Sequence, residues 1–138
     1  MNWHELNVSA LGTHHEQAGQ PVYSERFDEV LKFHSPGLAS VTRGDEAWHI
    51  GPDGHGAYER RFLRAFGFYE GFAAVQALDG WHHIRPDGSD VYPERYDWCG
   101  NFQSGRCTVR LRDGSYRHVF ADRSPVYPTI WRYAGDYK

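Results

Sequence analysis

The 138-residue sequence lacks most of the features that mark a membrane, secreted or nucleic-acid-binding protein. It has only two cysteines, too few for a disulfide framework. No run approaches the roughly 18 consecutive apolar residues of a membrane-spanning helix. The net charge is −3, so the basic excess needed to bind nucleic acid or anionic membranes is missing. We therefore expect neither nucleic acid nor membrane as a partner.

The first residues also lack the elements of a secretory signal. Residues 1–6 read Met-Asn-Trp-His-Glu-Leu and contain neither a basic start nor an apolar core. On this basis we expect a cytoplasmic protein.

Aromatic residues, in contrast, are abundant. The chain contains 5 Trp, 9 Tyr and 8 Phe, 16% of its residues, together with 15 Gly and 7 Pro. Aromatic side chains favour strands, whereas glycine and proline favour turns. This composition predicts a β-rich protein with many turns.

The aromatic residues recur at an interval of 34 or 35 residues, which indicates a tandem repeat. Three aromatic columns, a glycine column, a valine column and a histidine column share this interval. They are Tyr23, Tyr58, Tyr92 and Tyr127; Phe27, Phe62, Tyr96 and Trp131; Phe33, Phe68, Phe102 and Tyr137; Gly37, Gly71 and Gly105; Val41, Val75 and Val109; and His14, His49, His83 and His118. Chance does not explain six columns in one register.

The columns divide the chain into a cap and a series of units. Residues 1–12 fit no column and are expected to form an N-terminal cap, which exposed repeat ends generally need. The repeat domain covers residues 13–138. Its units lie at about 13–47, 48–80 and 81–115, followed by an incomplete unit at 116–138.

Each unit is predicted to form a three-stranded antiparallel meander. Asp113-Gly114 separates two alternating runs, a pattern typical of a hairpin, and Asp79-Gly80 lies at the same place one repeat earlier. Pro-Asp-Gly at 52–54 and 86–88 predicts a second turn. The expected strands are the Gly-x-Ala-x-Val, Trp-x-His-Ile and Tyr-x-x-x-aromatic segments. Such units can form an open twisted array, which we favour, or a β-propeller.

These columns resemble the WG (Trp-Gly) repeats of bacterial proteins. The resemblance rests on residues 68–75 (Phe-Tyr-Glu-Gly-Phe-Ala-Ala-Val), residues 79–84 (Asp-Gly-Trp-His-His-Ile) and Tyr96-Asp97, and it covers residues 13–138. His82 or His83 stands where the family usually has the glycine of its name. The resemblance implies interaction and architecture more than a reaction. In some relatives such repeats precede a methyltransferase domain, which this sequence lacks.

The histidine column is the most interesting candidate for chemistry. His14, His49, His83 and His118 would line one surface of a stacked array, and histidine is the commonest transition-metal ligand. A metal site, however, needs three or four ligands around one ion, whereas these residues are a whole repeat apart. We therefore favour a structural interpretation, in which each histidine makes the same hydrogen bond to its neighbouring unit.

The cysteines and carboxylates show no catalytic pattern. Cys99 and Cys107 occupy columns filled by alanine in other units, which predicts buried structural residues. Asp53, Asp87 and Asp122 are predicted turn residues. Glu25, Glu59 and Glu94 each precede an arginine (Arg26, Arg60 and Arg95), which predicts a row of solvated or interstrand ion pairs. We expect no enzymatic activity and no cofactor.

The aromatic side chains that fall outside the columns are the best candidates for binding. The periodic rings are expected to form the core between neighbouring units, because a short unit has no other core. The remaining candidates are Trp98, Tyr69, Phe72 and Trp3. The sequence thus favours a non-catalytic module for protein interaction or scaffolding, with self-association through open repeat ends as one mode. Binding of a carbohydrate or small ligand is the alternative, and an accessory domain of a larger methyltransferase is a more distant one.

Overall fold

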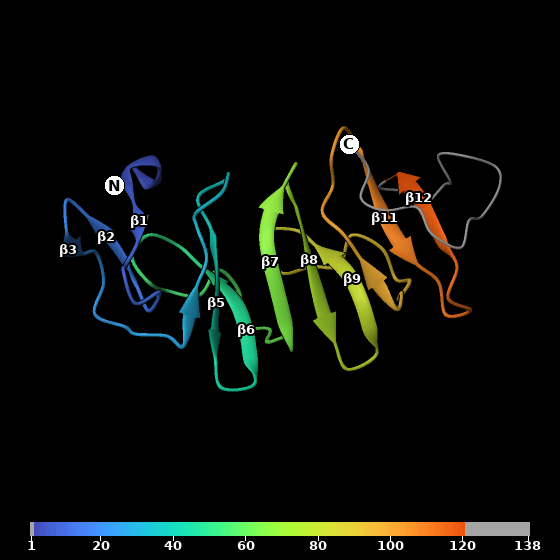
Figure 1. Ribbon diagram of the computed structural model, residues 1–138, viewed down its shortest axis with the longest axis horizontal. Coiled ribbons are helices and arrows are strands. Elements are labelled where there is room, and N and C mark those ends of the chain that lie inside the picture. Colours follow the sequence, from blue (N-terminus) through green and yellow to red (C-terminus); the bar gives the residue numbers. More distant parts are fainter. Residues whose placement is uncertain (1, 121–138) are drawn as a thin grey trace.

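The computed structural model describes residues 2–120, and they form an all-β array of four three-stranded antiparallel sheets (Figure 1). A 3-10 turn, η1 (Trp3–Glu5), precedes them. The strands are Asn7–Val8 (β1), His15–Gln17 (β2) and Gln20–Pro21 (β3); Glu29–Val30 (β4), Ala39–Arg43 (β5) and Glu46–Ile50 (β6); Arg64–Tyr69 (β7), Phe72–Ala77 (β8) and Gly80–Ile84 (β9); and Trp98–Cys99 (β10), Arg106–Arg110 (β11) and Tyr116–Phe120 (β12). The predicted fold class is confirmed. β1 lies inside residues 1–12, which were expected to form a cap. Within residues 2–120 no helix is long and apolar enough to span a membrane.

The hairpins follow the predicted turns. In the third sheet, β8 and β9 are joined at Leu78-Asp79, with Ala77 opposite Gly80. In the fourth sheet, Arg110 lies opposite Tyr116 around the Asp-Gly turn. The third-sheet turn depends on Gly80, whose φ of +130° is rarely adopted by residues with a side chain.

The aspartates of the Pro-Asp-Gly turns are turn residues, as predicted, and their carboxylates accept hydrogen bonds from the same loop. The Asp53 carboxylate accepts from the backbone N–H of His55 at 3.0 Å, and Asp87 accepts from that of Ser89 at 2.9 Å. For Asp87 the hydroxyl of Ser89 also donates, at 2.6 Å, and this bond is the main reason why its carboxyl pKa lies below the usual range; for Asp53 the main reason is the backbone bond from His55. Asp122 lies outside the described residues.

One predicted strand is wrong. The Tyr-x-x-x-aromatic segments are connecting loops, and each of the last three sheets is completed by the segment that follows such a loop, namely β4, β7 or β10. A spacing of four places two rings on the same face of a strand, which is why the pattern suggested one. The first loop instead curls around Arg26, whose Nη1 donates to the carbonyls of Tyr23, Ser24 and Glu25.

Consecutive sheets are joined by short backbone bridges at the ends of these loops. Phe62 and Ala47 exchange both N–H···O bonds, at 2.7 and 2.9 Å, and Tyr96 and Trp81 do the same at 2.8 and 2.9 Å. Each loop therefore bonds to the sheet behind it before its chain enters the next sheet.

Aromatic rings fill the space between sheets, as the columns predicted. The ring of Tyr23 lies 6.1 Å from that of Phe27, which in turn lies 5.8 Å from Trp48. The same edge-on stacking recurs at Tyr58 and Phe62, at 6.0 Å. The valine column and both cysteines are buried beneath these rings. Burial raises the pKa of the Cys107 thiol to about 12.

Candidate functional site

The histidine column joins each sheet to the next one through a repeated pair of hydrogen bonds. In every instance Nδ1 lies 2.6 Å from the hydroxyl of the column tyrosine, and Nε2 lies 2.7–2.8 Å from a backbone carbonyl 16 or 17 residues further on. The instances are His15 with Tyr23 and Leu31, His49 with Tyr58 and Phe66, and His83 with Tyr92 and Gly100. Each carbonyl belongs to the first strand of the next sheet (Phe66) or to the residue directly after that strand (Leu31 and Gly100). The predicted structural role, a repeated hydrogen bond, is thus found at His49 and His83. The bond joins neighbouring sheets, whereas both of its partners fall inside one predicted unit (48–80 or 81–115), because the sheets straddle the predicted unit boundaries.

The partners of these bonds determine which tautomer the neutral histidine adopts. A carbonyl oxygen can only accept, so Nε2–H donates to it; Nδ1 is then the acceptor, and the tyrosine hydroxyl donates. Burial lowers the pKa of His49 and of His83 to about 4, and it raises the pKa of Tyr23 to about 12. Both ring nitrogens of His15, His49 and His83 are engaged in this way.

The first member of the column is His15 and not His14, contrary to the prediction. His15 is fully buried, whereas the half-buried His14 points its Nε2 at the Glu16 carboxylate, 3.1 Å away. Histidine and tyrosine are 8 residues apart in this unit and 9 in the next two, so counting back at a constant 35 from His49 reached the wrong neighbour. His118 is buried, and Tyr127, the tyrosine of its unit, lies outside the described residues. Residues 2–120 contain no group of three or more side chains suited to hold a metal ion.

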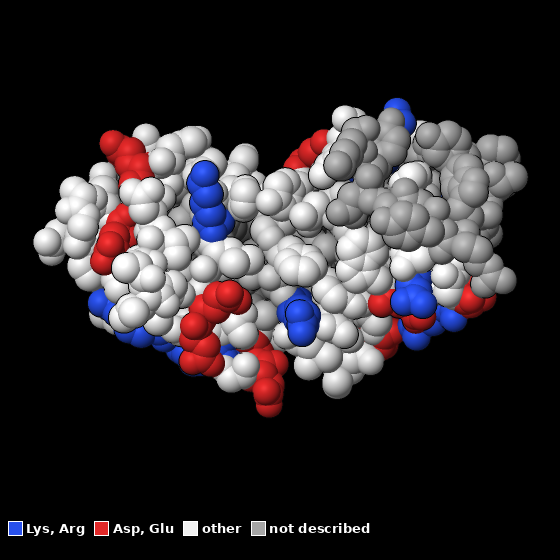
Figure 2. Space-filling view, viewed as in Figure 1, with Lys and Arg blue, Asp and Glu red and all other residues white. Residues whose placement is uncertain are grey.

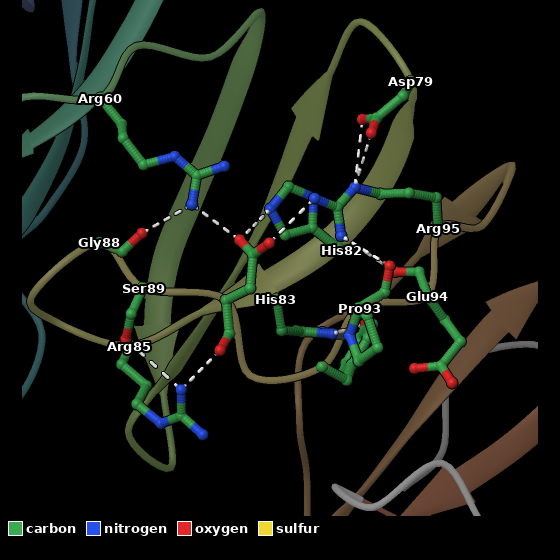
Figure 3. A network of polar contacts seen from close by, with 12 residues as sticks. Arg60, Asp79, His82, His83, Arg85, Gly88, Ser89, Pro93, Glu94 and Arg95 are labelled. Atoms are coloured by element: carbon green, nitrogen blue, oxygen red, sulfur yellow. Dashed lines mark hydrogen bonds and ion pairs between the residues drawn. The ribbon is translucent and has the colours of Figure 1, made fainter.

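A second polar cluster surrounds His82, next to the column histidine on β9 (Figure 3). The Asp90 carboxylate accepts from Arg60 Nη1 at 2.7 Å and from Arg95 Nη2 at 2.9 Å, and it lies 3.0 Å from His82 Nε2. Arg95 also pairs with Asp79 at 3.1 Å. The His82 side chain is completely buried, and neither of its ring nitrogens makes a hydrogen bond of good geometry within the described residues. Burial, helped by the Arg95 charge, lowers the pKa of His82 to about 4.

This cluster connects two loops to each other and to β9. His82 stands where the preceding sheet has Trp48, and it contacts Phe62 at 5.9 Å much as Trp48 contacts Phe27 at 5.8 Å. Both oxygens of Asp90 are bound by arginines from two different loops. Of the arginines in the predicted row of ion pairs, Arg60 and Arg95 pair with Asp90, and Arg26 donates to carbonyls of its own loop. The substitution of histidine for tryptophan in a core column was the signal in the sequence that could have indicated this cluster.

Three of the four predicted binding aromatics lie along one edge of the array. Tyr69 ends β7 and faces Phe72 across the turn to β8, and its ring lies 4.7 Å from that of His34. Trp3 and His34 line a hollow of about 280 Å³, together with Leu6, Lys32 and Phe33. We call Trp3, His34, Tyr69 and Phe72 the aromatic edge. Trp98, in β10, pairs with Arg110 at the other end of the last sheet from the Ser104-Gly105 turn, and, like Phe72, it packs on the core of that sheet.

The aromatic edge is held firmly by its surroundings. The Trp3 ring lies against Gly37, where an added Cβ would come within 2.8 Å of the indole. The Glu70 carboxylate, in the turn between Tyr69 and Phe72, accepts from the backbone N–H groups of Ser104 and Gly105 at 2.5 and 2.7 Å. The turn that carries two of the rings is therefore bonded to the equivalent turn of the next sheet.

Comparison with solved structures bears on the arrangement of the sheets. The crystal structure of BamB from Moraxella catarrhalis, a β-propeller, superposes with a TM-score of 0.52 at 12% identity, over 86% of this chain and 40% of that chain. The sheets follow one another in a propeller-like manner. At this identity the likeness concerns the fold alone, and the chain spans less than half the length of BamB. The sequence matches no family model and no curated protein, so the resemblance to WG repeats stays a prediction.

Proposed function

We propose that this protein is a non-catalytic repeat module that binds a protein partner through the aromatic edge. The observation that carries the proposal is a row of partly exposed rings on a firmly bonded frame. Tyr69 is 38% exposed although it lies beside His34 and opposite Phe72. Rigid aromatic side chains bury a large area at a small entropic cost, which is why they are enriched among binding hot spots.

The hollow beside Trp3 favours a second candidate function, the binding of a small ligand such as a carbohydrate. Its wall is a stacked pair of rings, Trp3 and His4, with centroids 3.7 Å apart, and Lys32 lies at its border. At about 280 Å³ it falls just below the roughly 300–1,000 Å³ of typical ligand sites. The row of rings extends well beyond this hollow, and for that reason we prefer a protein partner.

The test places a photo-crosslinking amino acid at position 69 of the full chain and, as a control, at Leu11, which is 85% exposed and belongs to the turn between β1 and β2. We expect a discrete crosslinked protein from position 69 and none from position 11. Affinity for the protein captured should fall at least tenfold with Tyr69→Ala and stay unchanged with Leu11→Ala. Equal capture at both positions, or an affinity that Tyr69→Ala leaves unaltered, would contradict the proposal. Saturable binding of a simple sugar that Trp3→Ala removes would favour the small-ligand alternative.

A further inference from the structure

A second surface lies at the opposite end of the same strands. β8 runs from Phe72 at the aromatic edge to Ala77, where the hairpin turn Leu78-Asp79 begins (Figure 1). Leu78 is 95% exposed at the tip of this tight turn, a position that polar residues and glycine usually occupy. Burial within the described part of the chain therefore does not account for this leucine.

Leu78 borders a shallow apolar groove between the second and third sheets. The groove measures about 540 Å³, and its apolar lining consists of Phe62, Leu63, Ala77 and Leu78. Leu63 is 41% exposed, and its backbone N–H donates to the carbonyl of Gln76 at 2.8 Å, which holds it beside the end of β8. Two exposed leucines from different segments thus meet at one groove.

The rim of the groove is acidic. Asp45 and Glu46, at the hairpin turn of the second sheet, line it together with Asp79 and Arg61. Asp79 is paired with Arg95. The guanidinium of Arg61 lies 4.0 Å from the Trp48 ring centroid and donates to three carbonyls of its own loop. Figure 2 shows acidic side chains gathered on this edge, below β5 and β6. The charge that the rim presents to a partner is therefore mainly that of Asp45 and Glu46.

We propose that this groove binds a short segment of a protein partner in which leucine-like side chains are flanked by lysine or arginine. The apolar side chains would cover Leu63 and Leu78, and the basic groups would approach Asp45 and Glu46. Both features are needed, because an apolar segment alone leaves the carboxylates unpaired and a basic segment alone leaves the leucines in water. This surface is separate from the aromatic edge, so the proposal goes beyond the function proposed above.

The probe is the synthetic peptide Lys-Lys-Leu-Leu-Lys-Lys, blocked at both ends and titrated into the isotope-labelled full chain while amide NMR shifts are recorded. We expect saturable shifts centred on Leu63, Leu78 and Glu46. Leu78→Ser should weaken binding about tenfold, since it removes most of one leucine contact. Asp45→Asn with Glu46→Gln should weaken binding several-fold and reduce its dependence on salt. Leu11→Ser, an equivalent turn leucine outside the groove, serves as the matched control and should change nothing.

Several results would overturn this inference. The first is no binding, or equal binding by the Leu78→Ser variant. If a peptide with glutamate in place of lysine binds as tightly, Asp45 and Glu46 do not attract basic groups of the partner. If the shifts are confined to Trp3, His34 and Tyr69, the peptide binds at the aromatic edge and not in the groove. Concentration-dependent dimerisation that Leu78→Ser abolishes would show that a second copy of the chain occupies the groove. Tyr69→Ala should leave peptide binding intact. Failure of the groove proposal can therefore be told apart from failure of the function proposed for the aromatic edge, which Tyr69→Ala tests.

Discussion

At the scale of single residues, the column histidine determines how this chain is built. Its two ring nitrogens lie on opposite sides of the imidazole, so one of them can bind the tyrosine of its own loop while the other binds a carbonyl of the next sheet. Lysine has no acceptor, and serine has a single oxygen that cannot span the same distance. The column histidine, a possible metal ligand by its sequence pattern, therefore connects neighbouring sheets through two hydrogen bonds.

Removal of one tyrosine hydroxyl tests this role. Tyr58→Phe leaves Nδ1 of the buried His49 without its donor at 2.6 Å. We expect the free energy of unfolding to fall by about 1–3 kcal/mol, the usual cost of an unsatisfied buried polar group, measured by urea denaturation. Tyr69→Phe is the control, because its hydroxyl lies 3.5 Å from His34 at an exposed position, and it should cost less than about 0.5 kcal/mol. Equal effects in the two variants would contradict the role given to His49.

At the scale of secondary-structure elements, what the sequence predicted correctly was local. The hairpins at Asp79 and Asp113 and the turns at Asp53 and Asp87 followed from residues a few positions apart. The first strand of each sheet was missed because its pairing is decided by bonds over longer distances, such as Phe62 to Ala47. His14 was assigned to the column in place of His15 because counting at a constant interval does not detect a loop that is one residue shorter. The aromatic edge was found in part, whereas His34 belongs to no column and was missed.

The turn between β8 and β9 provides a prediction at this scale. Gly80→Ala adds a Cβ that would lie 2.8 Å from the Tyr96 carbonyl oxygen, in addition to the strain of a φ of +130°. Gly114→Ala in the next sheet carries similar strain at a φ of +88°, yet its Cβ would meet no heavy atom closer than 3.8 Å. We expect Gly114→Ala to cost about 1 kcal/mol and Gly80→Ala at least about 2 kcal/mol more, measured by thermal and urea unfolding. A smaller loss for Gly80→Ala than for Gly114→Ala would show that the bridge to Tyr96 is not tightly packed.

At the scale of the whole molecule, no sheet is independent of its neighbours. Each sheet after the first receives a histidine bond from the sheet before it, and backbone bonds and packed rings join neighbouring sheets as well. Stability in such an array is the sum of the units and their interfaces, so a change that affects every interface acts on the entire fold. The two surfaces proposed for binding lie at opposite ends of the strands, and both depend on these interfaces for their shape.

Acidification is a change that affects the interfaces between sheets, because buried histidines form hydrogen bonds across them. His49 and His83 have a folded-state pKa of about 4, below the roughly 6.5 of an unfolded histidine, so the unfolded chain takes up protons first. Their contribution to stability is fully present above pH 6.5, is lost progressively as pH falls towards 4, and amounts to about 3 kcal/mol each over that range. Because two such losses rival the whole stability of an ordinary domain, we expect cooperative unfolding before pH 4 is reached.

The measurement is the free energy of unfolding in urea at pH 7, 6 and 5. It should decline with increasing slope as the pH falls below 6.5. His83→Gln should lower stability at pH 7, because glutamine does not reproduce both bonds of the ring, and it should also flatten the decline, because one titrating group is gone. A structural defect alone would lower stability equally at all three pH values and leave the slope unchanged. A stability that stays constant or rises between pH 7 and pH 5 would mean that the histidines are not held neutral between the sheets.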